Sequence, residues 1–159
     1  MNLDPKSLAL PDFTVEEIQR CIDVTEPGFY ETGLIVDANN VMYRLAFAGS
    51  KDCYTSSDML AMFVERIKSV VTDINADVVV CCIDSGVPLR RSMLGATKKP
   101  DKTPEQQAVV DMARDALHLL RVQEGGSNGW LNPRWQDGYE ADDLCAAWAV
   151  SGHFVHTVL

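Results

Sequence analysis

Apolar positions along the chain predict alternating strands and helices from Gly33 onward. The run Gly33–Asp37 is short and apolar and ends in a carboxylate, which is typical of a buried strand whose tip leaves the sheet. Across Ser57–Asn75, apolar residues recur at steps of three and four between charged ones, which predicts an amphipathic helix. Asp77–Asp84 is again apolar, rich in β-branched residues and ends in Asp. Strand, helix and strand in this order predict a parallel pair joined by a right-handed crossover.

The second half of the chain begins with a break in this pattern. Residues 85–103 have no helical period and contain glycines and prolines, which predicts a long loop. A helix then starts at a clear signal: Thr103 is suited to the N-cap, Pro104 to the first helical position, and Gln106 completes a capping box. The amphipathic run that follows predicts a second long helix.

The end of the chain carries one more helix and one more strand. Gly138–Ser151 is predicted to be a turn that enters a third helix, and His153–Leu159 to be a third buried strand. These elements define an α/β fold over residues 34–159, with a central, mostly parallel sheet and helices on both faces. Residues 1–33 form an N-terminal extension, in which Val15–Val24 is predicted to be a short helix.

Composition narrows the class of protein. The 159 residues are 47% hydrophobic and 23% charged, as in an ordinary globular domain. There is no apolar run of about 20 residues and no signal-peptide pattern, so we expect no membrane partner. The five cysteines form no metal-binding spacing, and in a chain without a signal peptide they indicate reduced thiols in the cytoplasm. The formal net charge of −9 argues at first against a nucleic-acid partner.

Carboxylates stand at three places where elements of the predicted sheet end. Asp37 and Asp84 each follow a strand, and Glu140, Asp142 and Asp143 stand at the mouth of a helix. Because ligands bind outside the carboxyl ends of parallel strands, these acids can share one crevice, where oxygen ligands favour Mg²⁺ or Mn²⁺. One or two such ions serve phosphodiester hydrolysis. Taken singly, each acid also fits a turn or a helix start.

A basic segment follows the strand that delivers Asp84. Five of the 14 basic residues fall within 13 positions, namely Arg90, Arg91, Lys98, Lys99 and Lys102. Phosphate contacts need local positive charge rather than a basic protein, so this segment suits a phosphodiester substrate; a solvated surface loop is the alternative. Tyr43, near Asp37, could stack on a base or simply pack.

Three motifs, in order, resemble the 5′-to-3′ exonuclease and flap endonuclease family, which includes the 5′-nuclease domain of bacterial DNA polymerase I and its phage relatives. The segment Leu34–Arg44 (LIVDANNVMYR) is similar to the family's opening strand, whose Asp is a metal ligand and which continues to a Tyr-Arg pair. Val78–Asp84, followed by Arg90 and Lys98, resembles the second strand and the helical arch. Gly138–Asp143 (GYEADD) matches the family's most specific signature.

The resemblance implies a PIN-like 5′-nuclease fold and a Mg²⁺- or Mn²⁺-dependent hydrolysis of DNA that carries a 5′ end or flap, in replication or repair, in a bacterial or phage-infected cell. Up to two ions would be bound. The metal ligands implied are Asp37, Asp84, Glu140, Asp142 and Asp143. The scissile phosphate would be positioned and polarised by Arg90 and Lys98. The substrate would be bound by Tyr43, Arg44, Arg91, Lys99 and Lys102.

The family continues past the point where this sequence ends. Its next element is a pair of aspartates after the strand that HTVL would form, followed by a helix–hairpin–helix-type module, whereas this sequence stops at Leu159. We therefore expect a C-terminally incomplete member of the family. The alternatives are a catalytically incomplete DNA-binding module, one half of a split nuclease completed by a second polypeptide, and a PIN-like ribonuclease.

Overall fold

A sheet of four parallel strands forms the centre of the molecule. The structure is a computed structural model that describes residues 30–48, 55–86, 89, 102–122 and 129–159. The sheet has the order β3-β2-β1-β4, and every pair of neighbours is parallel. The strands are β1 (Tyr30–Asp37), β2 (Val78–Cys82), β3 (Pro133–Arg134) and β4 (Phe154–Val158). The predicted parallel pair is β1 and β2, and its register sets Asp37 beside Cys82.

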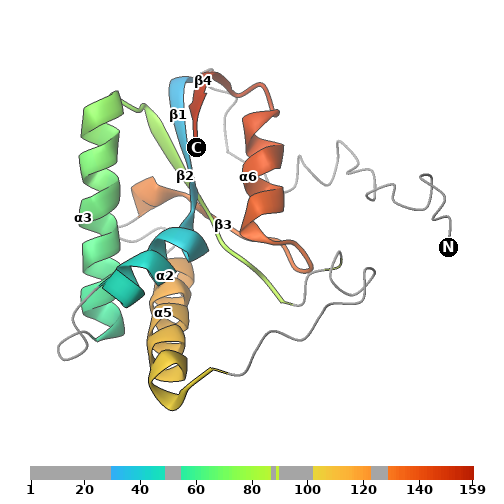
Figure 1. Cartoon of the computed structure of the whole chain (residues 1–159). Helices are drawn as coiled ribbons and strands as arrows, with labels where there is room; N and C mark the ends of the chain where they lie inside the picture. The colour runs from blue at the N-terminus through green and yellow to red at the C-terminus, as the bar shows by residue number, and fades with distance from the viewer. Residues whose placement is uncertain (1–29, 49–54, 87–88, 90–101, 123–128) are drawn as a thin grey trace, which may run out of the picture.

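Helices cover both faces of this sheet. Figure 1 shows α2 (Ala38–Ala48), α3 (Ser56–Ile74) and α5 (Pro104–Val122) on one side, and α6 (Ala141–Ala149) on the other. Each side has its own core: Phe63 and Met42 are fully buried in the first, and Trp148 lies in the second. The predicted α/β architecture with helices on both faces is therefore confirmed.

The start of α5 lies where the capping signal places it. The backbone nitrogen of Gln106 donates to Oγ1 of Thr103 at 3.3 Å, and the backbone nitrogen of Thr103 donates to Oε1 of Gln106 at 3.1 Å. This reciprocal pair satisfies two donors that the first turn of a helix leaves without intrahelical acceptors. The helix Ser56–Ile74 has the same device, with Thr55 and Asp58 in place of Thr103 and Gln106.

The strand β4 corrects one prediction. His153–Leu159 was expected to be buried, but β4 lies at the edge of the sheet, and its middle residues, such as Val155 (68% exposed), face solvent. An apolar run predicts burial only where a neighbour covers it. Here β4 pairs with β1 alone among the described strands, and its inward contacts are made by Phe154 and Val158.

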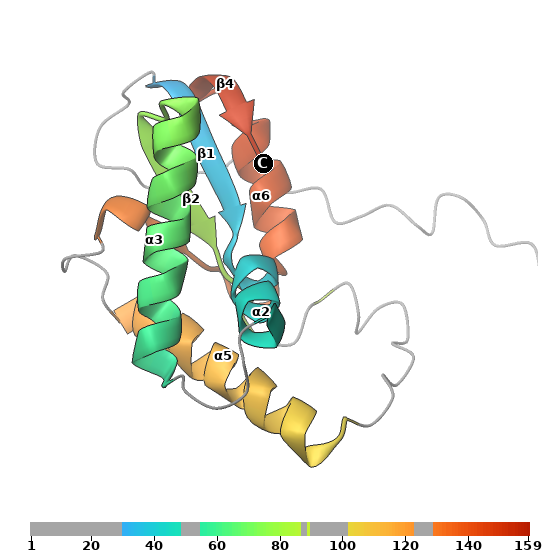
Figure 2. The ribbon, with the colours of Figure 1, turned by 60° about the vertical axis from the view of Figure 1, so that its left-hand side comes forward.

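The carboxyl ends of β1 and β2 meet at one edge of the sheet. Figure 2 shows both strands running toward α2 and α5, and α6 beginning near the same edge. β1 passes directly into α2 without a loop. The candidate acids on these strands and at the start of α6 are thus delivered to one side of the molecule, as the topology predicts.

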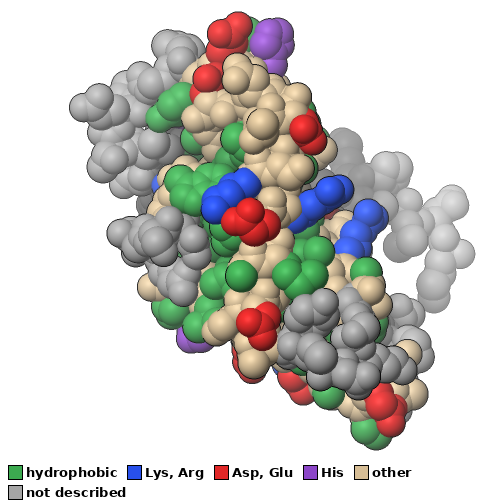
Figure 3. All heavy atoms as spheres, turned by 90° about the vertical axis from the view of Figure 1, so that its left-hand side faces the viewer, with side chains coloured by type: hydrophobic (Ala, Val, Ile, Leu, Met, Phe, Trp, Pro, Cys, Tyr) green, Lys and Arg blue, Asp and Glu red, His purple; other side chains and the backbone are tan. Residues whose placement is uncertain are grey.

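The outer face of α3 has a mixed character. Acidic and basic side chains are interspersed there with apolar ones (Figure 3), and Lys68 pairs with Glu65 at 2.8 Å. Among the helices that the structure describes, none is long and apolar enough to cross a bilayer. The expected helix Val15–Val24 lies outside the described residues and remains a prediction. The expected division of the chain at residue 33 falls within β1, which begins at Tyr30, and it also remains a prediction.

Candidate metal and phosphate site

Asp84 is held by three different helices. Its backbone nitrogen donates to Oδ1 of Asn39 in α2 at 2.9 Å, and its carbonyl oxygen accepts from Nη2 of Arg121 in α5 at 2.7 Å. Its side-chain oxygen Oδ1 accepts from the backbone nitrogen of Ala141, the first residue of α6, at 2.7 Å. Asp84 follows β2 by two residues, so these bonds fix the exit of that strand against its neighbours.

Asp37 stands at the end of β1, half-buried, beside two other carboxylates. Burial raises the pKa of its carboxyl group above the ordinary value, and the nearby charges of Asp142 and Asp84 raise it further. A hydrogen bond from the backbone nitrogen of Asn40 to Oδ1, 2.8 Å long, acts in the opposite direction. The structure therefore brings three of the five predicted ligands together: one from β1, one from the end of β2 and one from α6.

Glu140 and Asp143 have a local role at the start of α6. Glu140 is the N-cap residue and is buried, with 8% exposure, and Asp143 accepts a hydrogen bond from the backbone nitrogen of Glu140 at 3.1 Å. Acidic residues in a first turn also interact favourably with the helix dipole. The capping alternative thus holds for Asp143. Metal binding by Glu140 and Asp143 remains a prediction.

A tight turn aligns the start of α6 with Asp84. Gly138 has a positive φ of 88°, and its backbone nitrogen donates to the carbonyl oxygen of Ser85 at 3.1 Å. The backbone nitrogen of Ser85 in turn donates to the carbonyl oxygen of Tyr139 at 3.2 Å, and its hydroxyl donates to Asp137 at 2.6 Å. The signature glycine therefore has a structural role: it docks one acidic segment onto the other.

The donor chemistry at this edge fits a hard cation. The converging groups Asp37, Asp84 and Asp142 offer only carboxylate oxygens, the ligands that Mg²⁺ and Mn²⁺ prefer. Among the described residues, no three His, Cys, Asp or Glu side chains are already arranged around a common metal position. Carboxylates that repel one another are held together when a cation neutralises them or when the pKa of one of them rises, and the pKa of Asp37 is raised here by burial and by the charges of Asp142 and Asp84.

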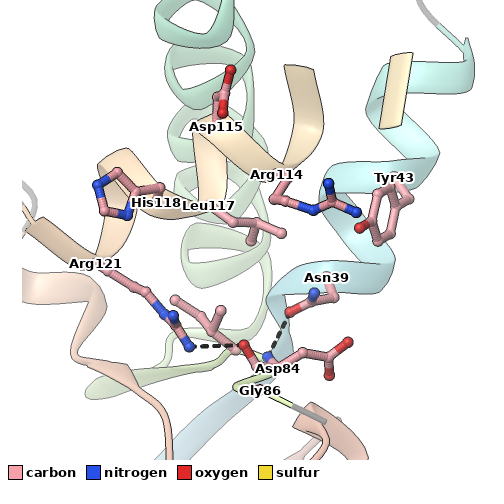
Figure 4. Close-up of a pocket in the computed structure, with 10 residues that line it drawn as sticks. Asn39, Tyr43, Asp84, Gly86, Arg114, Asp115, Leu117, His118 and Arg121 are labelled. Atoms are coloured by element: carbon pink, nitrogen blue, oxygen red, sulfur yellow. Dashed lines mark hydrogen bonds between the residues drawn. The ribbon is translucent and has the colours of Figure 1, made fainter. Parts of the chain in front are cut away.

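A cavity of about 540 Å³ opens beside Asp84, between α2 and α5. Figure 4 shows Asn39 and Tyr43 on one wall and Arg114, His118 and Arg121 on the other. Tyr43 is half-buried; burial raises the pKa of its hydroxyl, while the positive charge of Arg114 lowers it. The cavity therefore joins the acidic edge of the sheet to a wall with basic side chains.

The predicted basic residues fall into two groups. Arg90, Arg91, Lys98 and Lys99 lie outside the described residues, so their roles remain predictions. Lys102 is exposed just before α5, and Arg44 is exposed on α2, where it lines a hollow of about 330 Å³ together with Asp37 and Asn40. Arg44 and Tyr43 thus lie near the acids, as expected.

Several residues around the site were missed at the level of sequence. Asn39, which fixes Asp84, gives no pattern that distinguishes it from other polar residues in a turn. The basic residues of α5 do give a signal, because positions 114, 118 and 121 follow helical spacing and share one face. From the sequence, His118 is expected to be structural, and Arg114 and Arg121 are less conspicuous than the concentrated basic segment before α5.

These elements define an α/β domain with a central parallel sheet, helices on both faces and an acidic edge. Among solved structures, the chain is similar to a flap endonuclease of bacteriophage T5 crystallised with metal ions, with a TM-score of 0.55 and 23% identity. The match covers 76% of this chain and 44% of that one. A second structure of the T5 enzyme, a complex with DNA and metal ions, has a TM-score of 0.49, 21% identity and the same coverage. No family model and no curated protein matches the sequence.

This chain thus spans less than half the length of the T5 enzyme. The likeness establishes the fold. It gives no support to the expectation of a second polypeptide, and it leaves substrate and activity to be argued from the residues.

Proposed function

We propose that this chain is the metal-binding part of a 5′ nuclease that hydrolyses phosphodiester bonds in DNA with a 5′ end or a flap. The observation that carries the proposal is the convergence of Asp37, Asp84 and Asp142 at the carboxyl edge of the sheet. A cluster of like charges is unfavourable in an isolated domain, and a bound cation offsets that cost.

Each acid has a distinct structural support for this role. Asp37 ends β1 and is oriented by the backbone of Asn40, and Asp84 is oriented by the backbone of Ala141. Asp142 lies in the first turn of α6, next to Ala141. Asp37, Asp84 and Asp142 would hold Mg²⁺, which would supply activation of water and stabilisation of the leaving oxygen for phosphodiester hydrolysis. The residues of the chain hold the ion and orient the phosphate against it.

The solved T5 structures support a metal-dependent reaction on DNA. One of them contains metal ions and has the same fold as this chain, which is what a shared metal-dependent chemistry requires. A flap is the substrate that the T5 enzyme's name states, and the resemblance of the GYEADD segment to the 5′-nuclease signature extends the proposal to a 5′ end. We further propose a cytoplasmic site of action, in a bacterial or phage-infected cell, in replication or repair.

The test is a cleavage assay on a 5′-labelled flap duplex with Mg²⁺, compared with the same reaction in chelator. We expect cleavage by the unmodified chain and none by Asp37→Ala or Asp142→Ala. Asp73→Ala, which removes an exposed acid of α3, is the matched control and should cleave normally. Equal rates for all four proteins would show that the acidic cluster is not the active site.

Calorimetry with Mg²⁺ separates binding from turnover. We expect the unmodified chain and Asp73→Ala to bind Mg²⁺, and Asp37→Ala to bind it more weakly or not at all. Faster cleavage of single-stranded RNA than of the flap would replace the DNA assignment with a PIN-like ribonuclease. Absence of both Mg²⁺ binding and cleavage would reject the proposed activity for this chain.

A further inference from the structure

Three basic side chains of α5 share the wall of the cavity beside Asp84. Arg114, His118 and Arg121 are separated by four and three residues, so they lie on one face of the helix, and all three line the cavity. Figure 4 shows them in succession along α5, opposite Asn39 and Tyr43 of α2. The protein has a net charge of −9, so a concentration of positive charge next to an acidic edge needs an explanation.

Arg121 is already engaged by the protein. Its Nη2 donates to the carbonyl oxygen of Asp84 at 2.7 Å, and its guanidinium lies over the ring of Trp135, 5.2 Å from the centroid. Burial lowers the pKa of its guanidinium because desolvation disfavours the charged form, while the charges of Asp137 and Asp84 act in the opposite direction. Arg121 is therefore a positioning residue, which holds the exit of β2 in place.

Arg114 and His118 are available to a ligand. Arg114 has a side chain that is 65% exposed and pairs with Asp111 of the same helix at 3.0 Å. An exposed pair of this kind contributes little to stability, so a phosphate can exchange with it. His118 is exposed one turn further along α5. In Figure 4 the guanidinium of Arg114 points toward Tyr43, across the mouth of the cavity.

We propose that Arg114 and His118 bind a phosphate of the DNA strand, next to the phosphate that lies at the acidic cluster. This inference rests on the proposed function and adds the residues that hold the strand beside the site. A cavity of about 540 Å³ is within the range of natural ligand sites and accommodates one nucleotide unit. Arginine offers several donors in a fork that suits phosphate, and imidazole offers an N–H even when it is neutral.

The acids around the cavity favour a strand over a free nucleotide. Asp84 and Asp115 also line it, so a compact dianion such as a nucleotide monophosphate meets repulsion on both sides. The phosphates of a strand carry one charge each and lie apart, so one can reach Arg114 while the next reaches the metal-binding acids. Tyr43, on the opposite wall, offers an aromatic face to the base between them.

The experiment measures binding of a fluorescently labelled single-stranded decathymidylate by anisotropy, in Ca²⁺, over a series of salt concentrations. Ca²⁺ binds carboxylate oxygens and neutralises the acidic edge. Electrophoresis of the probe after each titration verifies that it is intact. We expect Arg114→Gln to weaken binding about tenfold and to lower the slope of log affinity against log salt by about 0.7, the value of one lost phosphate contact. His118→Gln should weaken binding with a smaller change in slope.

Three controls separate charge from structure. Arg114→Lys keeps the charge and should restore most of the slope. Asp111→Asn breaks the same ion pair from the other side, and it should bind at least as well as the unmodified chain. Arg66→Gln removes an exposed positive charge from α3, outside the cavity, and should leave affinity and slope unchanged.

The outcomes distinguish this inference from the proposed function. If Arg114→Gln behaves like Arg66→Gln while the flap is cleaved, the phosphate assignment is wrong and the nuclease assignment stands. If the slope falls as expected but Asp37→Ala still cleaves, the phosphate assignment stands and the acidic cluster is not the active site. Displacement of the probe by thymidine monophosphate at the probe's own binding concentration would assign the cavity to a free nucleotide. Absence of any binding to the decathymidylate would overturn the inference.

Discussion

The side-chain oxygen Oδ1 of Asp84 accepts a hydrogen bond of 2.7 Å from the backbone nitrogen of Ala141. This bond joins the end of β2 to the first turn of α6, which are 57 residues apart in the sequence. The N-terminus of a helix has free N–H groups and a partial positive charge, so it stabilises a carboxylate. One carboxylate oxygen of Asp84 is thereby oriented by the protein, while the second oxygen remains available to a ligand.

The acidic edge predicts an unusual effect for Asp37→Asn. Asparagine keeps a side-chain oxygen that can accept the hydrogen bond from the backbone nitrogen of Asn40, so the bond at the start of α2 is preserved. It removes one of the mutually repelling charges, so we expect the melting temperature of the metal-free protein to rise by about 1–2 °C, after screening by solvent is taken into account. Cleavage should fall about a hundredfold or more, because a metal ligand is lost.

Calorimetric melting with and without Mg²⁺ measures this effect. The unmodified protein should gain stability from Mg²⁺, and Asp37→Asn should gain little. Asp73→Asn, on the exposed side of α3, is the control and should respond to Mg²⁺ like the unmodified protein. A metal-free Asp37→Asn protein that is less stable than the unmodified one would contradict the repulsion argument.

The raised pKa of Asp37 also predicts how pH affects the site. In the folded protein the neutral carboxyl is favoured, so the stability contributed by Asp37 is present at acidic pH and is lost as pH rises through its folded pKa. The metal requires the ionised form, so Mg²⁺ affinity should fall as pH is lowered from about 7 to about 4.

With rising pH, the Mg²⁺ affinity should increase while the metal-free stability contributed by Asp37 decreases, and the two quantities are measured separately. Titration calorimetry at several pH values gives the affinity, and melting in chelator gives the metal-free stability. The stability difference between Asp37→Asn and the unmodified protein should grow with rising pH and vanish at acidic pH. A difference that is constant over this range would show that Asp37 does not titrate differently in the folded state.

The sequence was sufficient to predict elements whose signals are local. The helix start at Thr103 and Pro104 was placed correctly because a capping box and a proline restrict the backbone directly. The parallel pairing of β1 with β2 followed from the amphipathic helix between two apolar runs. The edge position of β4 was not predictable, because burial depends on neighbouring elements rather than on the run itself.

The candidate site was predictable in its acids but not in its supports. Asp37 and Asp84 follow strands, and parallel topology alone brings such residues to one edge. Asp84 is held by the side chain of Asn39 and the backbone nitrogen of Ala141, and Asp37 accepts from the backbone nitrogen of Asn40. Bonds from backbone groups leave no distinctive pattern of side-chain types in the sequence. The helix α2 was missed because its residues directly continue a strand motif, and no turn signal separates the two elements.

Gly138 offers a test of how the two acidic segments are aligned. A Cβ at this position would lie 2.9 Å from Cγ of Leu89, and the positive φ of 88° is unfavourable for any L-residue with a side chain. We expect Gly138→Ala to lose about 1–2 kcal/mol of stability and to weaken both Mg²⁺ binding and cleavage, while far-ultraviolet circular dichroism stays the same.

Gly152→Ala is the matched control for Gly138→Ala. Gly152 also has a positive φ, 76°, but a Cβ there would have no atom within 4 Å, and the residue lies between α6 and β4. The backbone strain of the two variants is therefore similar, and only Gly138→Ala should affect the site. Equal Mg²⁺ affinity in the two variants would show that the Gly138 turn does not set the position of the acids.

Gly33 offers a separate test of the sheet itself, at the point where β4 packs on β1. Replacing glycine by alanine in a strand usually favours the strand, because glycine is entropically costly there. A Cβ on Gly33, however, would lie 2.5 Å from the ring of Phe154, which also stacks with Trp148 at a centroid distance of 6.0 Å. The ring is held on both sides and has little room to move.

We therefore expect Gly33→Ala to lower the free energy of unfolding by about 1–3 kcal/mol, as is typical of overpacking. Gly129→Ala, where a Cβ would meet nothing within 4 Å, should be near neutral. The double variant Gly33→Ala with Phe154→Leu should be less destabilised than the sum of its single changes, because a smaller side chain leaves space for the new methyl group. Urea unfolding of the unmodified protein, Gly33→Ala, Phe154→Leu and the double variant gives this coupling energy. A coupling of zero would mean that β4 does not rest on β1 in solution, and that the edge of the sheet lies at β1 instead.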